Sequence, residues 1–144
     1  MSRREIPNPF APALHQVLLP EGWARPRGYS NGMLASGTLI TVGGQIGWNE
    51  KGEFSDGFID QVAQTLENVV AVLKAGGAGP EHLVRLTWYV TDMPGYRASL
   101  ARLGPHYRRI IGHHYPPMAV VGVTELVEPE AFVEIEALAI VPAR

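Results

Sequence analysis

The sequence predicts an α+β domain in which two helices pack on one face of a mixed six-stranded sheet. Two amphipathic helical patterns alternate with short apolar runs of the strand type, and the chain ends in a long run of alternating residues. With 144 residues, of which 46% are hydrophobic, the chain has the size of one domain with its own core. We therefore expect residues 1–144 to form a single domain.

The first part of the chain predicts an extended arm followed by three strands. Residues 1–13 contain three prolines, which neither propagate a helix nor donate ladder hydrogen bonds, so this segment is expected to be an extended arm. Residues 15–19 form a short apolar run. Two further runs, residues 31–35 and 38–42, meet at a Ser-Gly pair and predict a hairpin.

A helix is predicted after the glycine-rich segment 43–57. Ser55 and Asp56 are residue types that cap helix N-termini, and apolar residues then recur at steps of three and four as far as Leu73. Gly76 and Gly77 supply a C-terminal signal. We expect the helix to begin at the Ser-Asp pair and to end before these glycines.

The next elements are a strand, a second helix and another strand. Residues 83–91 alternate between apolar and polar side chains, which is typical of a half-buried strand, and Asp92 can cap the helix that follows. The Gly104-Pro105 pair is expected to kink this helix or to divide it in two. Residues 118–123 are almost continuously apolar and predict a strand that is covered on both sides.

The last strand, Phe132–Val141, contains two carboxylates in an otherwise apolar run. Side chains alternate along a strand, so Glu134 and Glu136 share one face. A buried carboxylate is costly unless it is paired, hydrogen-bonded or protonated. The two acids therefore either lie at an exposed edge or face a partner chain, or one of them is a general acid or base in a pocket.

Charge and cysteine content disfavour several classes of partner. The 12 basic and 14 acidic residues nearly balance, so we expect neither a nucleic-acid partner nor a membrane surface. The chain has no cysteine, no secretory signal pattern and no apolar run near the roughly 18 residues of a membrane helix. A soluble cytoplasmic protein is expected.

Metal and cofactor sites are also not expected. The adjacent His113 and His114 would diverge on an extended backbone instead of converging on a metal ion. Gly43-Gly44 lacks the Lys-Ser/Thr pair of a phosphate loop, and the chain has no Gly-x-Ser-x-Gly elbow for a serine hydrolase. Carboxylates, tyrosines and backbone amides remain as candidates for chemistry. One apolar face of the sheet would stay uncovered by helices, which favours a cyclic oligomer.

Four local patterns occur in an order that resembles the RidA/YjgF family, which hydrolyses reactive imines and enamines. They are Gly28-Tyr29-Ser30, Gly43-Gly44-Gln45-Ile46-Gly47, Gln61 with Asn68-Val69-Val70, and Val133-Glu134-Ile135-Glu136-Ala137. The resemblance covers roughly residues 14–141. It implies a chorismate-mutase-like α+β fold, assembled as a homotrimer with pockets at the subunit interfaces.

The resemblance also implies roles for individual residues. Glu134 matches the family glutamate that positions a water for attack on the imine carbon, whereas Glu136 is expected to be structural. Tyr29 resembles the pocket tyrosine, and Gly44 and Gln45 match the loop that lines the cleft. The glycine-rich loop has an alternative interpretation as simple turn geometry.

The chain departs from the family pattern at Met118. The family motif ends there in Pro-Ala-Arg, and the arginine binds the substrate carboxylate, whereas this chain has Pro-Pro-Met. A thioether offers only apolar contact, so a 2-iminoacid is expected to bind poorly. Met118 is either a core filler or a pocket residue. In the second case Trp48 and Tyr115 could add flat apolar surface, and Arg27 or His114 could return a polar group.

Two functional hypotheses follow from these observations. The first is a trimeric enzyme that hydrolyses or tautomerises a small imine or enamine, with Glu134 as the water-positioning base and no cofactor. The second is a non-catalytic small-molecule-binding or regulatory trimer that keeps the family cleft without its arginine.

Overall fold

The computed structural model describes residues 14–143, so the expected arm over residues 1–13 lies outside the described part. The helices and strands follow the order that the sequence predicts. They are β1 (Gln16–Leu18), β2 (Gly32–Leu34), β3 (Thr38–Ile46), α1 (Phe58–Ala75), the short 3₁₀ helix η1 (Pro80–His82), β4 (Leu83–Val90), α2 (Met93–Ile110), β5 (Met118–Gly122) and β6 (Val133–Val141).

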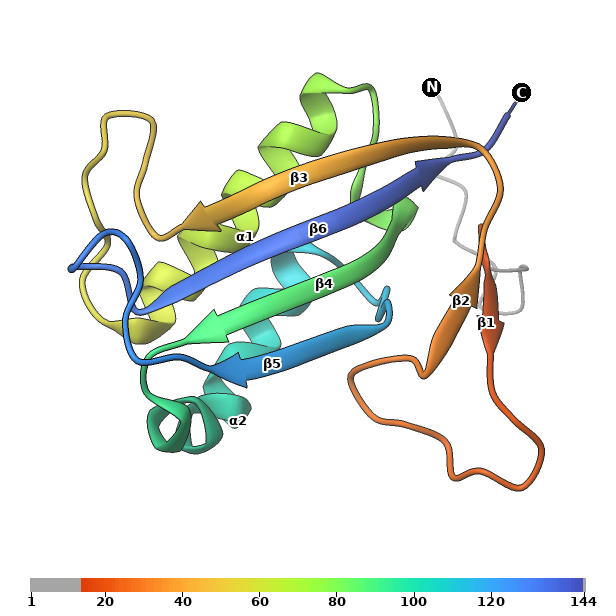
Figure 1. Ribbon diagram of the computed structural model, residues 1–144, viewed down its shortest axis with the longest axis horizontal. Helices are drawn as coiled ribbons and strands as arrows, with labels where there is room; N and C mark the ends of the chain where they lie inside the picture. Colours follow the sequence, from red (N-terminus) through yellow and green to blue (C-terminus); the bar gives the residue numbers. More distant parts are fainter. Residues whose placement is uncertain (1–13, 144) are drawn as a thin grey trace, which may run out of the picture.

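The strands form two sheets instead of the single six-stranded sheet that we expected. The main sheet has four strands in the order β3-β6-β4-β5, and β1 pairs with β2 in a separate two-stranded sheet (Figure 1). Strand β5 runs parallel to β4, while β6 is antiparallel to both of its neighbours, so the main sheet is mixed.

The expected hairpin between residues 31–35 and 38–42 is wrong. Strand β2 pairs with β1, and β3 pairs instead with the C-terminal strand, with Thr38 opposite Val141. The backbone at Gly37 has a φ of 145° and passes so close to Val141 that a Cβ would overlap the Val141 carbonyl. The chain therefore turns away at this glycine, and seven residues of β3 pair with β6, which is longer than the short hairpin could be.

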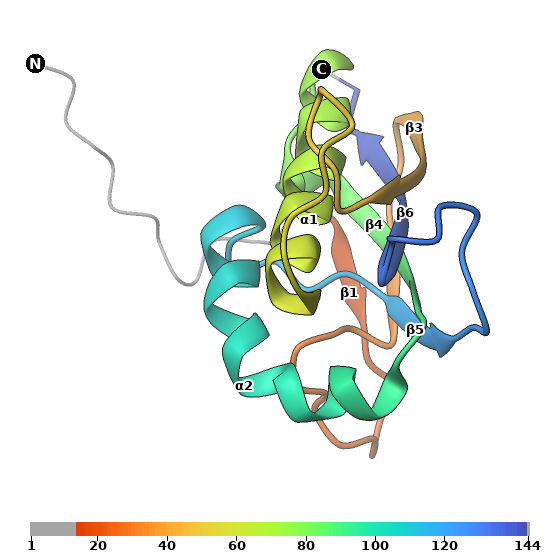
Figure 2. The same cartoon turned by 90° about the vertical axis from the view of Figure 1, so that its left-hand side faces the viewer.

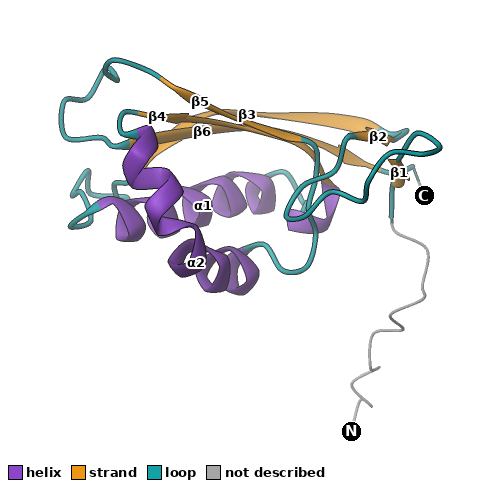
Figure 3. Ribbon diagram, turned by 90° about the horizontal axis from the view of Figure 1, so that it is seen from below, coloured by secondary structure: helices purple, strands orange, loops and turns teal. Residues whose placement is uncertain are grey.

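Both helices pack on one face of the main sheet, as the sequence predicts (Figure 3). On β6, Val133, Ile135, Ala137 and Ala139 are buried, and they meet the apolar stripe of α1 in the core. Leu66, Val69 and Leu73 of α1 are fully buried. This alternation directs Glu134 and Glu136 to the opposite face, which no helix covers.

Helix α1 begins two residues later than the Ser55-Asp56 pair predicts. Its N-cap is Gly57, which has a φ of 79° and forms no side-chain cap. A positive φ favours glycine, so the chain enters the helix through a turn that Ser and Asp side chains do not stabilise. The C-terminal prediction is confirmed: Gly77 has a φ of 75°, and the amide of Ala78 donates to the Leu73 carbonyl at 2.9 Å.

Helix α2 also has the predicted N-cap. Asp92 Oδ1 accepts a hydrogen bond from the Gly95 amide at 3.0 Å. The helix is continuous through Pro105 and is not divided in two. Figure 2 shows that its first half and its second half point in different directions, which agrees with the expected kink at the proline.

Within residues 14–143, no helix combines the length and the apolar character that crossing a membrane would require.

Candidate functional site

The uncovered face of the main sheet presents the two carboxylates of β6. Glu134 is half-buried and Glu136 is exposed, and the predicted sharing of one face is confirmed. Tyr89 of β4 lies directly opposite Glu134, and Thr87 lies opposite Glu136. The two acids are therefore close in sequence and direction but have different neighbours.

Glu136 has a hydrogen-bond partner within the chain. The Tyr89 hydroxyl donates to Glu136 Oε1 at 2.6 Å, and this bond raises the pKa of the Tyr89 phenol above its ordinary value. Within residues 14–143, no group donates a hydrogen bond to the Glu134 carboxylate. Glu134 therefore has free acceptor capacity, which a water-positioning base requires.

Gly44 and Glu134, both candidate site residues, lie side by side in the structure. The pairing of β3 with β6 shifts between Val42 and Gln45, so that Gly43 and Gly44 form a bulge in β3. A Cβ at Gly44 would overlap Glu134 Oε1. Glycine is thus needed at this position for the carboxylate to lie against the backbone of the loop.

Two amide side chains of α1, the buried Gln61 and the half-buried Asn68, hold this part of the sheet in place. Asn68 Nδ2 of α1 donates to the carbonyls of Ile46 at 2.9 Å and of Trp48 at 2.7 Å, which fixes the end of β3. Gln61 Nε2 donates to the Glu130 carbonyl, and its Oε1 accepts from the Phe132 amide, both at 2.9 Å. These contacts give a physical role to one of the four patterns noted in the sequence, Gln61 with Asn68-Val69-Val70.

A cavity of about 360 Å³ adjoins Glu136 on the same face. Its polar lining comes from Thr41, Arg85, Thr87 and Glu136, and Leu138 adds apolar surface.

Arg27, Tyr115 and Met118 lie together in a different cavity of about 480 Å³. Met118 is paired with Leu86, a buried residue that faces the helices, so its side chain lies on the helical side of the sheet. Glu134 lies on the other side. Within one chain, Met118, which stands where the family has arginine, therefore does not share a cavity with Glu134, the candidate base.

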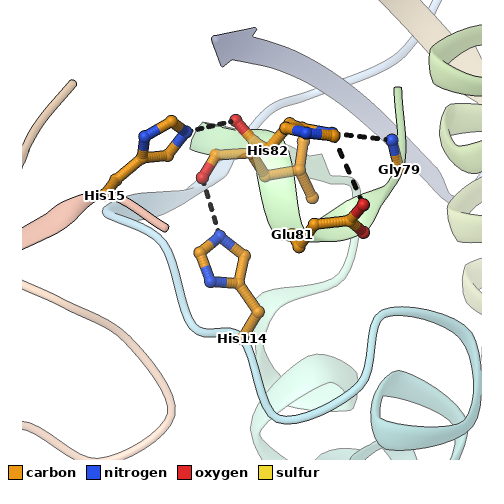
Figure 4. Close-up of polar contacts among 6 residues, drawn as sticks. His15, Gly79, Glu81, His82 and His114 are labelled. Carbon is orange, nitrogen blue, oxygen red and sulfur yellow. Dashed lines mark hydrogen bonds and ion pairs between the residues drawn. The ribbon is translucent and has the colours of Figure 1, made fainter. Parts of the chain in front are cut away.

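Tyr29 and His114 line a third cavity, of about 440 Å³. Tyr115 lines both this cavity and the cavity beside Met118. The sequence left open whether Arg27 and His114 reach a pocket. Arg27 lines the cavity beside Met118, and His114 lines the third cavity. His114 also has a structural role, because its Nε2 donates to the Leu83 carbonyl at 2.7 Å (Figure 4). Burial lowers the pKa of His114, and the nearby His15 and His82 act in the same direction.

His15 and His82 complete a polar cluster around η1. His15 is buried, and its Nε2 donates to the His82 carbonyl at 3.2 Å, while His82 Nδ1 accepts from the Gly79 amide at 2.9 Å (Figure 4). Each ring contacts backbone groups, so the rings do not converge on one point. Over residues 14–143, no group of three metal-ligating side chains is placed to hold an ion.

Gln45 and Trp48 line a fourth cavity, of about 440 Å³, between the loop after β3 and helix α1. The predicted residues thus fall into separate groups in one chain. Gly44 lies with Glu134, Arg27 and Tyr115 lie with Met118, Tyr29 lies with His114, and Gln45 lies with Trp48.

Sequence reasoning missed several residues of the cavity beside Met118. Tyr96, Leu100, Leu103 and Tyr107 of α2 line it, and none of them was a candidate site residue in the sequence. Arg108 of the same helix lines it as well. A signal was present in the sequence, because an apolar helix stripe flanked by arginine is also compatible with a ligand pocket.

Comparison with known proteins identifies the family. The family model described as Endoribonuclease L-PSP matches residues 23–141. The chain belongs to this family. A solved structure of a conserved Rid family protein, YyfB from Yersinia pestis, has a TM-score of 0.77 and 32% identity, covering 89% of this chain and 99% of that one. The RidA/YjgF resemblance and its α+β fold are thus confirmed.

Two further relatives support the same assignment to the RidA/YjgF family. A RutC family protein of Aquifex aeolicus is 36% identical over 138 residues, covering 95% of this chain and 98% of the relative. The Escherichia coli K12 protein named "Putative reactive intermediate deaminase TdcF" is 29% identical over 108 residues, covering 72% of this chain and 80% of that protein.

Proposed function

We propose that this RidA/YjgF family member is a trimeric enzyme that hydrolyses or tautomerises a small imine or enamine, with Glu134 as the water-positioning base. The main support is the placement of Glu134, which is half-buried against the Gly44 backbone while Glu136 is engaged by Tyr89. The deaminase name of TdcF supports the same class of reaction.

The chemistry needs only a carboxylate and a water molecule. The Glu134 carboxylate accepts a proton from the water as its oxygen attacks the imine carbon. Glu134 then returns this proton to the nitrogen, which gives a carbinolamine. A second proton passes from the carbinolamine hydroxyl, through the Glu134 carboxylate, to the nitrogen, so that the C–N bond breaks, ammonia leaves and a C=O bond forms. An enamine enters the same route after its carbon is protonated to give the imine. No cofactor takes part in these steps.

The proposed trimer would place residues from two chains in one cleft. Glu134 and Met118 lie on opposite sides of the main sheet, so a cleft that contains both requires a second copy of the chain. The uncovered face also exposes apolar surface, with Leu39 exposed to 55% and Phe132 to 42%. Covering this surface would stabilise an assembly of copies.

Met118 should make small 2-iminoacids poor substrates. A carboxylate clamp by arginine uses two charge-assisted hydrogen bonds, and the methionine thioether cannot replace them. The proposed substrates are therefore imines or enamines with more apolar surface than a small 2-iminoacid.

The test is a comparison of ammonia release by the wild-type protein and by Glu134→Gln. The substrates are freshly generated 2-aminoacrylate and bulkier or uncharged imines. Removal of a general base typically lowers a rate by about 10²- to 10⁴-fold. Glu136→Gln is the matched control, because the glutamine can still accept the Tyr89 hydrogen bond on the same face.

Wild-type rates no higher than those in buffer for every imine would overturn the enzymatic proposal. That result would favour the alternative, a small-molecule-binding or regulatory trimer. Equal losses in the two variants would show that Glu134 has no special part in the reaction.

A further inference from the structure

We propose that the cavity between α2 and β5 binds a small molecule with a planar apolar body and a carboxylate, and that Arg27 and Arg108 bind the carboxylate. This inference rests on the proposed function, because it names the substrate class of the same cleft. Arg27 and Arg108 would thus supply the positive charge that the family arginine, replaced here by Met118, would otherwise provide.

The inner wall of the cavity is aromatic and apolar. Trp88, Leu103 and Tyr107 line it and are exposed to only 5%, 5% and 8%. The Tyr107 and Tyr115 rings are stacked, with centroids 5.3 Å apart and an interplanar angle of 10°. The volume of about 480 Å³ lies within the range of small-molecule pockets, roughly 300–1,000 Å³. Flat rings in such walls favour a planar ligand.

The polar lining of the cavity is cationic. Arg27 and Arg108 are exposed while the aromatic wall is buried, so the two guanidinium groups belong to the open end. Among residues 14–143, no acidic side chain lines the cavity. Within residues 14–143 neither arginine forms an ion pair, whereas the neighbouring Arg109 lies 3.2 Å from Glu67. Two arginines without a carboxylate partner are suited to bind an anionic group.

Gly104 allows Arg108 to lie along the cavity wall. Gly104 is itself a lining residue, and a Cβ at this position would lie 3.0 Å from Arg108 Nη1. The guanidinium therefore lies over Gly104, where no side chain obstructs it. This placement directs the charge of Arg108 toward the cavity.

The indole of Trp88 is a further group in this cavity that could bind a polar atom of a ligand. Its indole Nε1 is buried and has no hydrogen-bond partner in the part of the chain that the structure describes. A buried donor without a partner is destabilising, so an acceptor atom of a ligand that reaches this group would gain binding energy. A carbonyl oxygen or an imine nitrogen is such an acceptor.

The arrangement selects ligands that extend from the apolar wall to the open end. A small 2-iminoacid next to Met118 would meet a thioether where a carboxylate needs a donor. A larger molecule can place its ring against Trp88 and Tyr115 and its carboxylate between the arginines. The inferred substrates are imines or enamines of aromatic carboxylates.

The binding test uses three stable probes and isothermal titration calorimetry of the wild-type protein. The probes are 3-phenylpropanoate, its neutral analogue 3-phenylpropanamide, and propanoate, which lacks the ring. We expect 3-phenylpropanoate to bind at least about tenfold more tightly than either of the others, because only it has both recognised groups. Its affinity should fall as salt is added.

The variant Arg27→Gln/Arg108→Gln should lose this preference. Its affinity for 3-phenylpropanoate should fall about tenfold or more, and its affinity for 3-phenylpropanamide should stay within about twofold. The matched control is Arg25→Gln/Arg102→Gln, which removes the same charge from residues that line other cavities. Equal affinity for the acid and the amide, or an equal loss in the control, would overturn the inference.

The result can be separated from the catalytic proposal. Binding of 3-phenylpropanoate should persist in Glu134→Gln, because this substitution removes a negative charge and leaves both arginines of the cavity in place. Specific binding without turnover of any imine would keep the ligand class and refute the enzyme. Hydrolysis of small uncharged imines that 3-phenylpropanoate does not inhibit would keep the enzyme and refute the ligand class.

Discussion

Glu134 and Glu136 show how residues of the same type and direction acquire different properties. Both project from the uncovered face of β6, but only Glu136 accepts the Tyr89 hydroxyl. Glu134 lies instead against the bulge at Gly43 and Gly44, where the backbone leaves room for its carboxylate. The difference arises from β3 and β4, which are far from β6 in the sequence.

Replacement of Met118 by arginine should recover part of the hydrolysis of small 2-iminoacids. The new guanidinium can form charge-assisted hydrogen bonds, each worth about 1.5–3 kcal/mol, which corresponds to a rise of about tenfold or more in kcat/KM for 2-aminoacrylate. Ammonia release measures the effect, and Met118→Leu is the apolar control. An unchanged rate in a variant that remains folded by circular dichroism would place the defect outside this position.

At the scale of the elements, the two helix N-termini differ in a way that can be measured. Asp92 caps α2 through the Gly95 amide, whereas Asp56 lies before the Gly57 cap of α1 and forms no cap. We expect Asp92→Ala to lower the free energy of unfolding by about 1 kcal/mol and Asp56→Ala by less than about 0.5 kcal/mol. Urea denaturation of both variants tests this order, and equal losses would contradict it.

The loop before β5 should make stability depend on pH through His114. Burial lowers the pKa of this ring in the folded state, so the unfolded chain binds the proton more readily. The contribution of neutral His114 to the free energy of unfolding is therefore fully present above the ordinary histidine pKa of about 6.5, and it decreases as the pH falls below that value.

Urea denaturation between pH 7.5 and 5 measures this dependence. His114→Gln should show a smaller decrease than the wild type, by at most about 1.4 kcal/mol per pH unit. The exposed neighbour His113 supplies the control His113→Gln, which should keep the wild-type slope. The same slope in all three proteins would show that another group is responsible.

At the scale of the whole molecule, the uncovered sheet face predicts the assembly. Sedimentation velocity of the wild-type protein should give the mass of a trimer. Leu39→Glu should shift the protein toward monomers, because a charge in an interface is costly to bury. Val127→Glu is the control, since Val127 is exposed to 94% in the loop before β6. A monomeric wild type would overturn the trimer and the shared cleft.

The patterns that could be predicted from the sequence are those that depend on local spacing. The apolar stripe from Phe58 to Leu73 and the alternation from Val133 to Val141 each bury one face of a single element, and the structure confirms both. The Asp92 cap is equally local. The hairpin at Gly37 was wrong because strand pairing depends on competition with the distant β6, which no local pattern contains.

The sequence by itself determined the fold class, the family and the shared face of the two carboxylates, because periodicity and motif order are properties of the chain. Only the tertiary structure decided which cavity each candidate residue lines. The sequence left Met118 as either a core filler or a pocket residue, and within one chain the sheet directs Met118 and Glu134 to opposite sides. Arg27 and Arg108, far apart in the sequence, line one cavity only because of the tertiary fold.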